Sequence, residues 1–238
     1  YGVWASSGYV QISSVVITTA GSLGIYEAGV RISSWSTIVY SSVTVAAAHG
    51  FWLDGATRTT VSLSTAVNST ASRYAVYLEN ARNNDFSVVL ASNSFSTGTG
   101  FYATGSGTNT VTLSRLWGGN IGLWLDGGSD YNTVSFSSMI GMSIGLYAGS
   151  ADSNTVTQSY LWGASNGASL NTGADYNTIS LSSMTGVSQY GLVVAADSNT
   201  VTQDSLWGGQ YGLYLNTGAQ YNSVSFSTMT GSANFGLY

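Results

Sequence analysis

From Asn109 onward the sequence repeats one four-residue phrase, whose commonest form is Asn-Thr-Val-Thr. Its six copies are separated by 23, 22, 23, 22 and 23 residues. They begin at Asn109, Asn132, Asn154, Asn177, Asn199 and Asn222. A fixed period in this range is typical of a solenoid, in which each repeat buries its apolar face only by stacking on its neighbours. We therefore expect function on the faces and ends of an elongated molecule.

The content of each repeat favours a β-solenoid over a helical one. Apolar residues occur in short alternating runs separated by Gly, Asn, Asp and Ser, and never at helical spacing. One coil divides into three short strands at residues 212–215, 222–225 and 227–230, and alternation turns Leu213 and Val224 inward. The sequence predicts an all-β, single-stranded right-handed parallel β-helix of about ten coils of 22–23 residues.

The repeats of residues 101–238 resemble those of right-handed parallel β-helix proteins, especially the NosD-type repeats related to the pectate-lyase superfamily. In that pattern a phrase such as Gly-Ile-Tyr-Leu precedes Asn-Thr-Ile-Ser, and here Gly-Leu-Tyr-Leu at 212–215 precedes Asn-Ser-Val-Ser at 222–225. Residues 1–100 contain drifted copies, so we expect irregular coils there and regular coils with a 45-residue two-coil repeat from 101 to 238. The resemblance implies a fold whose members include lyases, phage tailspikes, adhesins and surface-layer proteins, so function must be argued from residues.

Two columns of polar side chains are expected inside the helix. Alternation turns the six Asn residues inward, where they would stack at about 4.7–4.9 Å and hydrogen-bond to each other and to the backbone. The second inner column comprises Ser114, Ser137, Ser159, Ser182, Asp204 and Ser227.

Outward aromatic residues recur at equivalent places in the coils. They are Trp117, Trp162 and Trp207 in the third strand, and Trp124, Tyr147 and Tyr214 in the first. Aromatic stripes of this extent indicate lateral packing between rods or stacking on sugar rings. Alternatively, neighbouring rings stack on each other and only stiffen the face.

The second strand presents outward pairs of hydroxyl residues. The full Thr-x-Thr pairs are Thr110 with Thr112, Thr155 with Thr157, and Thr200 with Thr202, whereas the intervening coils contain Ser. Such an array resembles the ice-binding face of β-solenoid antifreeze proteins, but Ser lacks the methyl group that such a face uses. Thr and Ser are also ordinary outward residues of a half-exposed strand.

A column of carboxylates is expected just before the Asn residues, formed by Asp130, Asp152, Asp175 and Asp197. Stacked carboxylates could bind Ca²⁺, which takes six to eight oxygen ligands. Alternatively, each Asp caps its own turn through an Asx hydrogen bond, which is the interpretation we favour. Ca²⁺ is the one cofactor that the sequence suggests.

Composition argues against several classes of function. The net charge is −5, with no basic patch, so nucleic acid is not an expected partner. No apolar run approaches the roughly 18 residues of a membrane helix. Titratable groups are few and the single histidine, His49, has no nearby Ser or Asp arrangement that would make a triad, so we predict that the chain is not an enzyme.

The two ends of the sequence resemble strands of the same type. Tyr1, Val3 and Trp4 read as an opening strand, and Phe235, Leu237 and Tyr238 as the first strand of a further coil. Pairing of these edges between molecules would continue the helix. The sequence thus predicts an extracellular or cell-surface structural protein whose partner is itself, assembling head to tail and through its aromatic faces into a filament, sheath or surface layer. The alternatives are an ice-binding solenoid and a polysaccharide-binding or adhesin β-helix.

Overall fold

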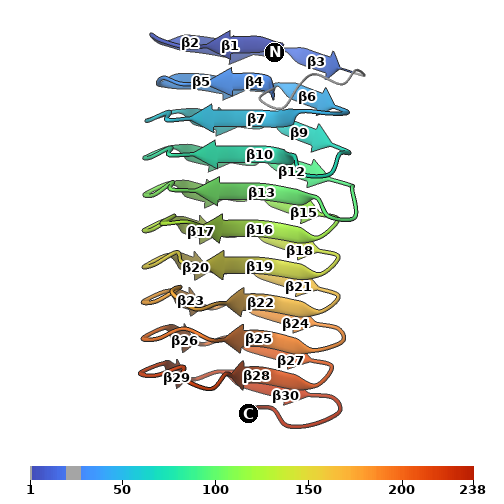
Figure 1. The fold of residues 1–238 in the computed structure, drawn as a ribbon, viewed down its shortest axis with the longest axis vertical. Coiled ribbons are helices and arrows are strands. Elements are labelled where there is room, and N and C mark those ends of the chain that lie inside the picture. Colours follow the sequence, from blue (N-terminus) through green and yellow to red (C-terminus); the bar gives the residue numbers. More distant parts are fainter. Residues whose placement is uncertain (1, 20–27) are drawn as a thin grey trace.

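The computed structural model describes residues 2–19 and 28–238 as a parallel β-helix. Three parallel sheets of ten strands each run along its length, and each coil contributes one strand to each sheet. The coils stack in a single file from the N-terminal to the C-terminal end (Figure 1). The predicted all-β fold of about ten coils with three strands per coil is confirmed. No helix long and apolar enough to cross a membrane is present in the described part of the chain.

Sheet A contains the first strand of every coil. Its strands are β1 (Val3–Ala5), β4 (Ala28–Ile32), β7 (His49–Asp54), β10 (Tyr74–Glu79), β13 (Thr99–Thr104), β16 (Ile121–Asp126), β19 (Ile144–Gly149), β22 (Asn166–Leu170), β25 (Tyr190–Val194) and β28 (Tyr211–Leu215). Equivalent core positions are 25 residues apart from Phe51 through Val76 to Phe101, then 22 to Leu123 and 23 to Leu146. The earlier of these coils are therefore longer than the later ones.

Sheet B contains the second strands, most of which have only three residues. They are β2 (Val10–Ser13), β5 (Ser36–Val39), β8 (Thr60–Ser62), β11 (Asp85–Ser87), β14 (Thr110–Thr112), β17 (Thr133–Ser135), β20 (Thr155–Thr157), β23 (Thr178–Ser180), β26 (Thr200–Thr202) and β29 (Ser223–Ser225). Residues in the left-handed region bound these strands, as Tyr131 (φ 59°) and Phe136 (φ 49°) do on either side of β17. Both corners are sharp, and the side chains of Tyr131 and Phe136 are exposed.

Sheet C contains the third strands. They are β3 (Val16–Thr19), β6 (Ser42–Val45), β9 (Thr65–Asn68), β12 (Leu90–Asn93), β15 (Arg115–Gly118), β18 (Ser138–Gly141), β21 (Tyr160–Gly163), β24 (Ser183–Gly186), β27 (Ser205–Gly208) and β30 (Thr228–Gly231). From β15 onward each strand ends in Gly because the chain turns tightly back into sheet A. A Cβ on Gly118 would lie 1.8 Å from the carbonyl oxygen of Ile121, which no side chain can accommodate.

The core is a continuous apolar column enclosed by the three sheets. Side-chain volume is balanced within coils: Phe51 and Phe86 each share their coil with an alanine on sheet C, Ala66 and Ala91 respectively. In these two coils a large ring is thus matched by a small side chain, as close packing requires.

The asparagine ladder lies at the corner that precedes sheet B. Each Asn side-chain oxygen accepts the backbone N–H of the Asn one coil earlier, as Asn132 Oδ1 does from Asn109 N at 2.9 Å. The side-chain amide of Asn109 also donates to Asn132 Oδ1 at 3.0 Å. The ladder extends beyond the six predicted residues to Asn84, whose backbone N–H donates to Asn109 Oδ1. These bonds satisfy backbone groups that are buried at the corner.

Candidate functional site

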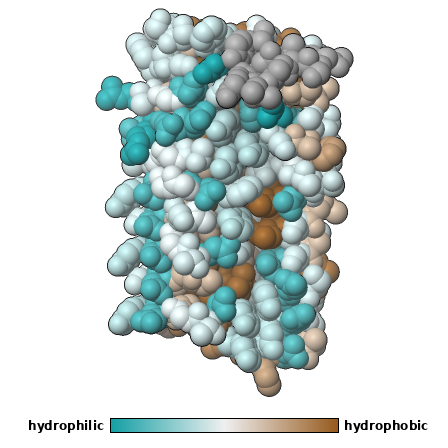
Figure 2. All heavy atoms as spheres, viewed as in Figure 1, coloured by the Kyte–Doolittle hydropathy of each residue, from teal (hydrophilic) through white to brown (hydrophobic). Residues whose placement is uncertain are grey.

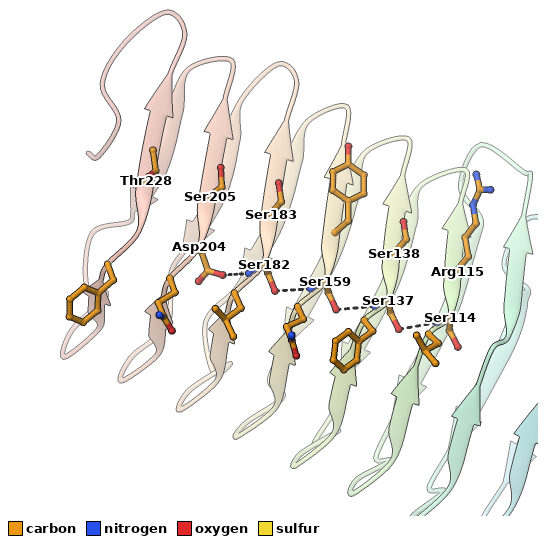
Figure 3. A pocket seen from close by; sticks show the side chains of 17 residues that line it. Ser114, Arg115, Ser137, Ser138, Ser159, Ser182, Ser183, Asp204, Ser205 and Thr228 are labelled. Atoms are coloured by element: carbon orange, nitrogen blue, oxygen red, sulfur yellow. Dashed lines mark hydrogen bonds between the residues drawn. The ribbon is translucent and has the colours of Figure 1, made fainter.

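An open trough runs along the corner between sheets B and C, from the coil of β15 to that of β30 (Figure 3). Its volume is about 1170 Å³. Its lining falls into three rows, which we call the rim, the floor and the wall. The rim comprises Leu113, Phe136, Gln158, Leu181, Gln203 and Phe226; the floor comprises Ser114, Ser137, Ser159, Ser182 and Asp204; the wall comprises Arg115, Ser138, Tyr160, Ser183, Ser205 and Thr228.

The rim consists of the residues that directly follow the sheet B strands. All six have positive φ, between 48° and 59°, and the apolar members are exposed, Phe136 by 55% and Phe226 by 90%. A bulky side chain at positive φ is an uncommon and unfavourable choice. An exposed apolar residue at a strained backbone position suggests that something other than stability selects it.

The wall consists of the outward-facing first residues of the sheet C strands. Tyr160 is exposed, and none of the described rings contacts Tyr160, Phe136 or Phe226. Two residues further along each strand lie the predicted outward tryptophans: Trp117 and Trp162 are half-buried and Trp207 is exposed. The trough therefore has aromatic rings that are free to contact a ligand.

The floor is the predicted serine column. Each serine hydroxyl accepts the backbone N–H of the equivalent residue one coil earlier, and Ser182 Oγ also donates to the carbonyl oxygen of Ser180 at 2.8 Å. Figure 3 shows these side chains in one file along the corner. The column also includes Ser41 and Ser64, which the sequence did not reveal because the earlier coils have drifted.

Asp204 is the one acid in the trough. Its side chain is only 4% exposed, and its Oδ1 accepts the backbone N–H of Ser182 at 2.7 Å while Oδ2 has no partner. Burial raises the pKa of Asp204 to about 6, and the backbone hydrogen bond from Ser182 opposes this shift. The charged groups of the trough are thus Asp204 and, at its N-terminal end, Arg115.

The aromatic residues of sheet A are arranged differently from those of the trough. Trp52 and Tyr77 stack with ring centres 5.6 Å apart and planes at 24°, and Tyr77 stacks on Tyr102 at 5.6 Å and 16°. Trp124 and Tyr147, both predicted interaction residues, continue the row edge to face at 5.4 Å. These rings cover one another, so this part of sheet A matches the self-stacking alternative.

The row is interrupted at Ser169 and Val193 and resumes at Tyr214, which stacks on Tyr238 at 5.3 Å. Figure 2 shows that the face bearing sheet A is mostly hydrophilic or intermediate in hydropathy, with apolar residues in a few small groups. This face does not present one large apolar patch.

The Thr-x-Thr residues form two regular columns on the outer face of sheet B. Thr110, Thr155 and Thr200 align in one, and Thr112, Thr157 and Thr202 in the other, with Thr or Ser between them. In the second column Ser180 donates to Thr157 Oγ1 at 3.0 Å and Ser225 to Thr202 Oγ1 at 2.9 Å. Some of the outward hydroxyls are therefore engaged with each other.

The aspartate column connects successive coils rather than capping single turns. Asp130 Oδ1 accepts the backbone N–H of Asp152, Asp152 Oδ1 that of Asp175, and Asp175 Oδ1 that of Asp197, each at 2.8 Å. The favoured interpretation, in which each Asp caps its own turn, is wrong in this respect. Within residues 2–19 and 28–238 no group of three or more His, Cys, Asp or Glu could hold a metal ion.

The predicted end residues that the structure describes lie at the two extremes of the rod. Val3 and Trp4 belong to β1, and Tyr1 lies outside the described residues. Leu237 forms an isolated parallel bridge with Leu213, so residues 235–238 do begin a further turn of sheet A. Phe235 and Tyr238 are exposed by 67% and 60%.

Comparison with known proteins identifies the family. The family described as periplasmic copper-binding protein (NosD) matches residues 3–135 and 96–226. The chain belongs to the NosD family. This NosD chain is accordingly a right-handed parallel β-helix repeat protein, as the sequence predicted. None of the curated proteins compared with the sequence matches it significantly.

Solved structures with the same fold are similar to the NosD chain at low identity. DFA-IIIase from Arthrobacter chlorophenolicus A6 is 11% identical with a TM-score of 0.55, over 87% of this chain and 65% of that one. A mutant of the periplasmic alginate epimerase AlgG is 11% identical, TM-score 0.55, over 97% and 72%. The pectate lyase Pel9A is 13% identical, TM-score 0.54, over 95% and 69%. The chain thus spans less than two thirds of the length of DFA-IIIase.

These neighbours correct the prediction that the chain is not an enzyme. Pectate lyase, alginate lyase, alginate epimerase and DFA-IIIase share its fold, so few titratable residues in a β-helix sequence are no ground for excluding catalysis. At 11–13% identity the likeness establishes the fold alone.

The residues of this chain do not fit the copper in the family description. Copper is bound by Cys, Met or His, and the chain has no Cys and one His, whose ring is buried. Met139, Met184 and Met229 occupy one column of sheet C, in which Leu161 and Leu206 separate them, and Met142 is exposed in the turn after β18, so they do not converge. The described residues of this chain therefore provide no copper site.

Proposed function

We propose that this NosD-family chain binds a polysaccharide that lies lengthwise in the trough. The observation that supports the proposal is the combination of exposed, unstacked rings with polar groups along one open channel. The rings are Phe136, Tyr160 and Phe226, and Gln158 and Gln203 lie in the coils between the two phenylalanines. Sugar rings present apolar C–H faces and hydroxyl groups, and sites of this mixed composition satisfy both. A trough that is open along several coils suits a chain rather than a single small molecule.

The family and the fold support this proposal. The family description is periplasmic, and structures that share the fold include enzymes named for pectate and alginate. We propose a periplasmic or extracellular location on the same basis.

The proposal is tested by affinity electrophoresis of the purified protein in gels containing pectate, alginate or a neutral glucan. Retardation by one of these polymers is expected, and Phe136→Ala and Tyr160→Ala should each weaken it roughly fivefold to a hundredfold, the effect of about 1–3 kcal/mol of lost contact. Tyr131→Ala is the matched control, because Tyr131 is 65% exposed and lies at the opposite end of β17 from Phe136. Equal retardation of Phe136→Ala, Tyr131→Ala and the unmodified protein would contradict binding in the trough.

A second candidate is cleavage of the bound polymer with Asp204 as proton donor. Asp204 lies in the floor of the trough and has a raised pKa, and a general acid works best with a pKa near the working pH. Because its carboxyl group is buried, proton transfer requires the side chain to turn toward the bound polymer. Release of new sugar ends by the unmodified protein, and its loss in Asp204→Asn with binding retained, is the expected result. Binding without product formation by the unmodified protein would reject this candidate and leave the first.

Self-assembly into a filament, and ice binding by the Thr-x-Thr columns, remain predictions of the sequence. Analytical ultracentrifugation over a range of concentrations tests the first, since a polymer sediments as a concentration-dependent distribution of sizes. An ice-recrystallisation assay that compares Thr157→Val with the unmodified protein tests the second.

A further inference from the structure

A small pocket lies on the outer face of sheet A, away from the trough, where β7 and β10 pass beside the turn at Ser72. Its volume is about 230 Å³. We call it the His49 pocket; its lining residues are His49, Trp52, Ser72, Arg73, Tyr74, Tyr77 and Glu79. It contains the only histidine of the chain together with an arginine and a glutamate. The polysaccharide proposal uses none of these residues.

Two nitrogen donors in this pocket are buried and have no hydrogen-bond partner. They are Nε1 of Trp52 and Nε of Arg73. Trp52 is only 4% exposed, and its indole is held by the Arg31 guanidinium, 4.2 Å from the ring centre, and by the stacked ring of Tyr77. An unpaired buried donor costs about 1–3 kcal/mol. Both donors belong to residues that line the same pocket, which makes it the place where an acceptor could pair with them.

A third donor comes from His49. Its Nδ1 accepts the backbone N–H of Tyr74 at 3.1 Å, which assigns the ring proton to Nε2. Burial and the neighbouring Arg73 lower the pKa of His49 to about 3, so the ring is neutral at physiological pH. The His49 ring also contacts the rings of Tyr77 at 4.8 Å and Trp52 at 5.6 Å, which fix its orientation.

The acceptor that fits these donors is restricted by charge. Arg73 contributes one positive charge to the lining and Glu79 one negative charge. Burial, followed by the charge of Glu79, raises the pKa of Tyr77, whose hydroxyl bonds to that carboxylate. The lining thus has no net charge and only one cation, so the second charge of phosphate or sulfate would have no partner there, whereas the single charge of a carboxylate can pair with Arg73.

We propose that the His49 pocket binds a single carboxylate group, with Arg73, Trp52 and His49 as its N–H donors. The carboxylate can come from a small free organic acid or from an acidic sugar unit of a polymer, and both supply the same chemistry. The pocket lies on sheet A and the trough on sheets B and C, so this inference does not depend on the proposed function.

The test is an NMR titration of the full chain labelled with ¹⁵N, observing the indole N–H signals. The Trp52 signal is identified by its disappearance in Trp52→Phe. Addition of sodium acetate should move this signal, because a new acceptor changes its hydrogen bonding, whereas sodium chloride at equal ionic strength should not. Galacturonate and polygalacturonate, added separately, distinguish the sources: a shift with the monomer points to small acids, and a shift with the polymer alone points to a glycan.

Two arginine variants provide the matched comparison. Arg73→Gln should weaken acetate binding at least about tenfold, equivalent to 1.4 kcal/mol. Arg82→Gln removes the same charge from an exposed residue outside the pocket and should leave the titration unchanged. The proposal is overturned if no carboxylate shifts the Trp52 signal, if chloride or neutral glucose shifts it equally, or if both arginine variants titrate like the unmodified protein.

Discussion

Oδ1 of Asp204 lies 2.7 Å from the backbone nitrogen of Ser182, at a position where the preceding coils place a serine hydroxyl. A serine there accepts one backbone N–H and donates to a carbonyl oxygen two residues earlier, as Ser182 does to Ser180. An ionised carboxylate can only accept, which leaves Oδ2 of Asp204 buried without a partner. Asp204 therefore destabilises a column in which the serine hydroxyls both donate and accept hydrogen bonds.

Replacement of Asp204 by serine should stabilise the protein at neutral pH. The pKa of this group rises from 3.8 in the unfolded chain to about 6 in the folded one, so the folded state holds its proton more tightly. The free energy of unfolding should consequently fall as pH rises through this window and stay at its lower value above it. Asp204→Ser should gain roughly 1–3 kcal/mol at pH 7 and little at pH 4. Denaturant unfolding at both pH values measures the difference.

The charge control for this experiment is Asp197→Asn. It removes one carboxylate from the neighbouring corner while retaining an oxygen that can accept the backbone N–H of Gln220. A gain of equal size in both variants would show that net charge, rather than the buried position of Asp204, is responsible.

His49 should produce the opposite pH dependence. Its folded pKa is about 3, below the ordinary 6.5, so the unfolded chain binds the proton more readily. The contribution of His49 to the free energy of unfolding is complete above pH 6.5 and is lost as pH falls toward 3. Over this range the free energy of unfolding changes by at most about 1.4 kcal/mol per pH unit. In His49→Gln this part of the slope should disappear, whatever the stability of the variant at pH 7. Thermal unfolding between pH 4 and 7 tests the expectation, and an unchanged slope would contradict it.

Much of the interior could be predicted because its rules are local. Alternation within short strands located Leu213 in the core, and the recurrence of Asn109 and Asn132 at coil spacing located the ladder. The sequence predicted an asparagine ladder that begins at Asn109, but the ladder also includes Asn84. Asn84 was missed because it lies in Asn-Asn-Asp and is not followed by the Thr-Val-Thr of the repeated phrase.

The surfaces were harder to predict because they depend on corner geometry. Alternation predicts side-chain direction only within a strand. Phe136 comes directly after β17, has positive φ and lines the trough, so alternation does not predict its direction. The His49 pocket could not be inferred either, since it joins His49 to Arg73 across one coil through a turn with no repeated sequence. One clue was available: apolar residues directly follow the second strand at Leu63, Val88 and Leu113, where Asn or Gly would suit the backbone better.

Removing one amide from the ladder should destabilise the fold strongly. Asn154 Oδ1 accepts both the backbone N–H of Asn132 at 2.8 Å and its side-chain amide at 3.0 Å, and Asn154 is only 3% exposed. Asn154→Ala leaves those donors buried and unpaired, so a loss of about 2–5 kcal/mol is expected. Asn234→Ala is the control, because this asparagine is exposed and its backbone N–H bonds to the carbonyl oxygen of Gln210, a contact that alanine retains. Chemical denaturation of the two variants gives the comparison, and similar midpoints would show that the ladder is not required.

The rim of the trough offers a variant in which stability and binding should change in opposite directions. Phe136 occupies the left-handed region at φ 49° with its ring 55% exposed, so the backbone is strained and the side chain gains little from burial. Asparagine tolerates this conformation better, and Phe136→Asn should raise the free energy of unfolding by up to about 1 kcal/mol. The same change removes an exposed ring from the trough and should weaken retardation by the bound polysaccharide. Tyr131→Asn, at φ 59° outside the trough, should gain stability without losing binding. If Phe136→Asn binds the polymer as well as Tyr131→Asn does, the ring is not retained at that strained corner for ligand contact.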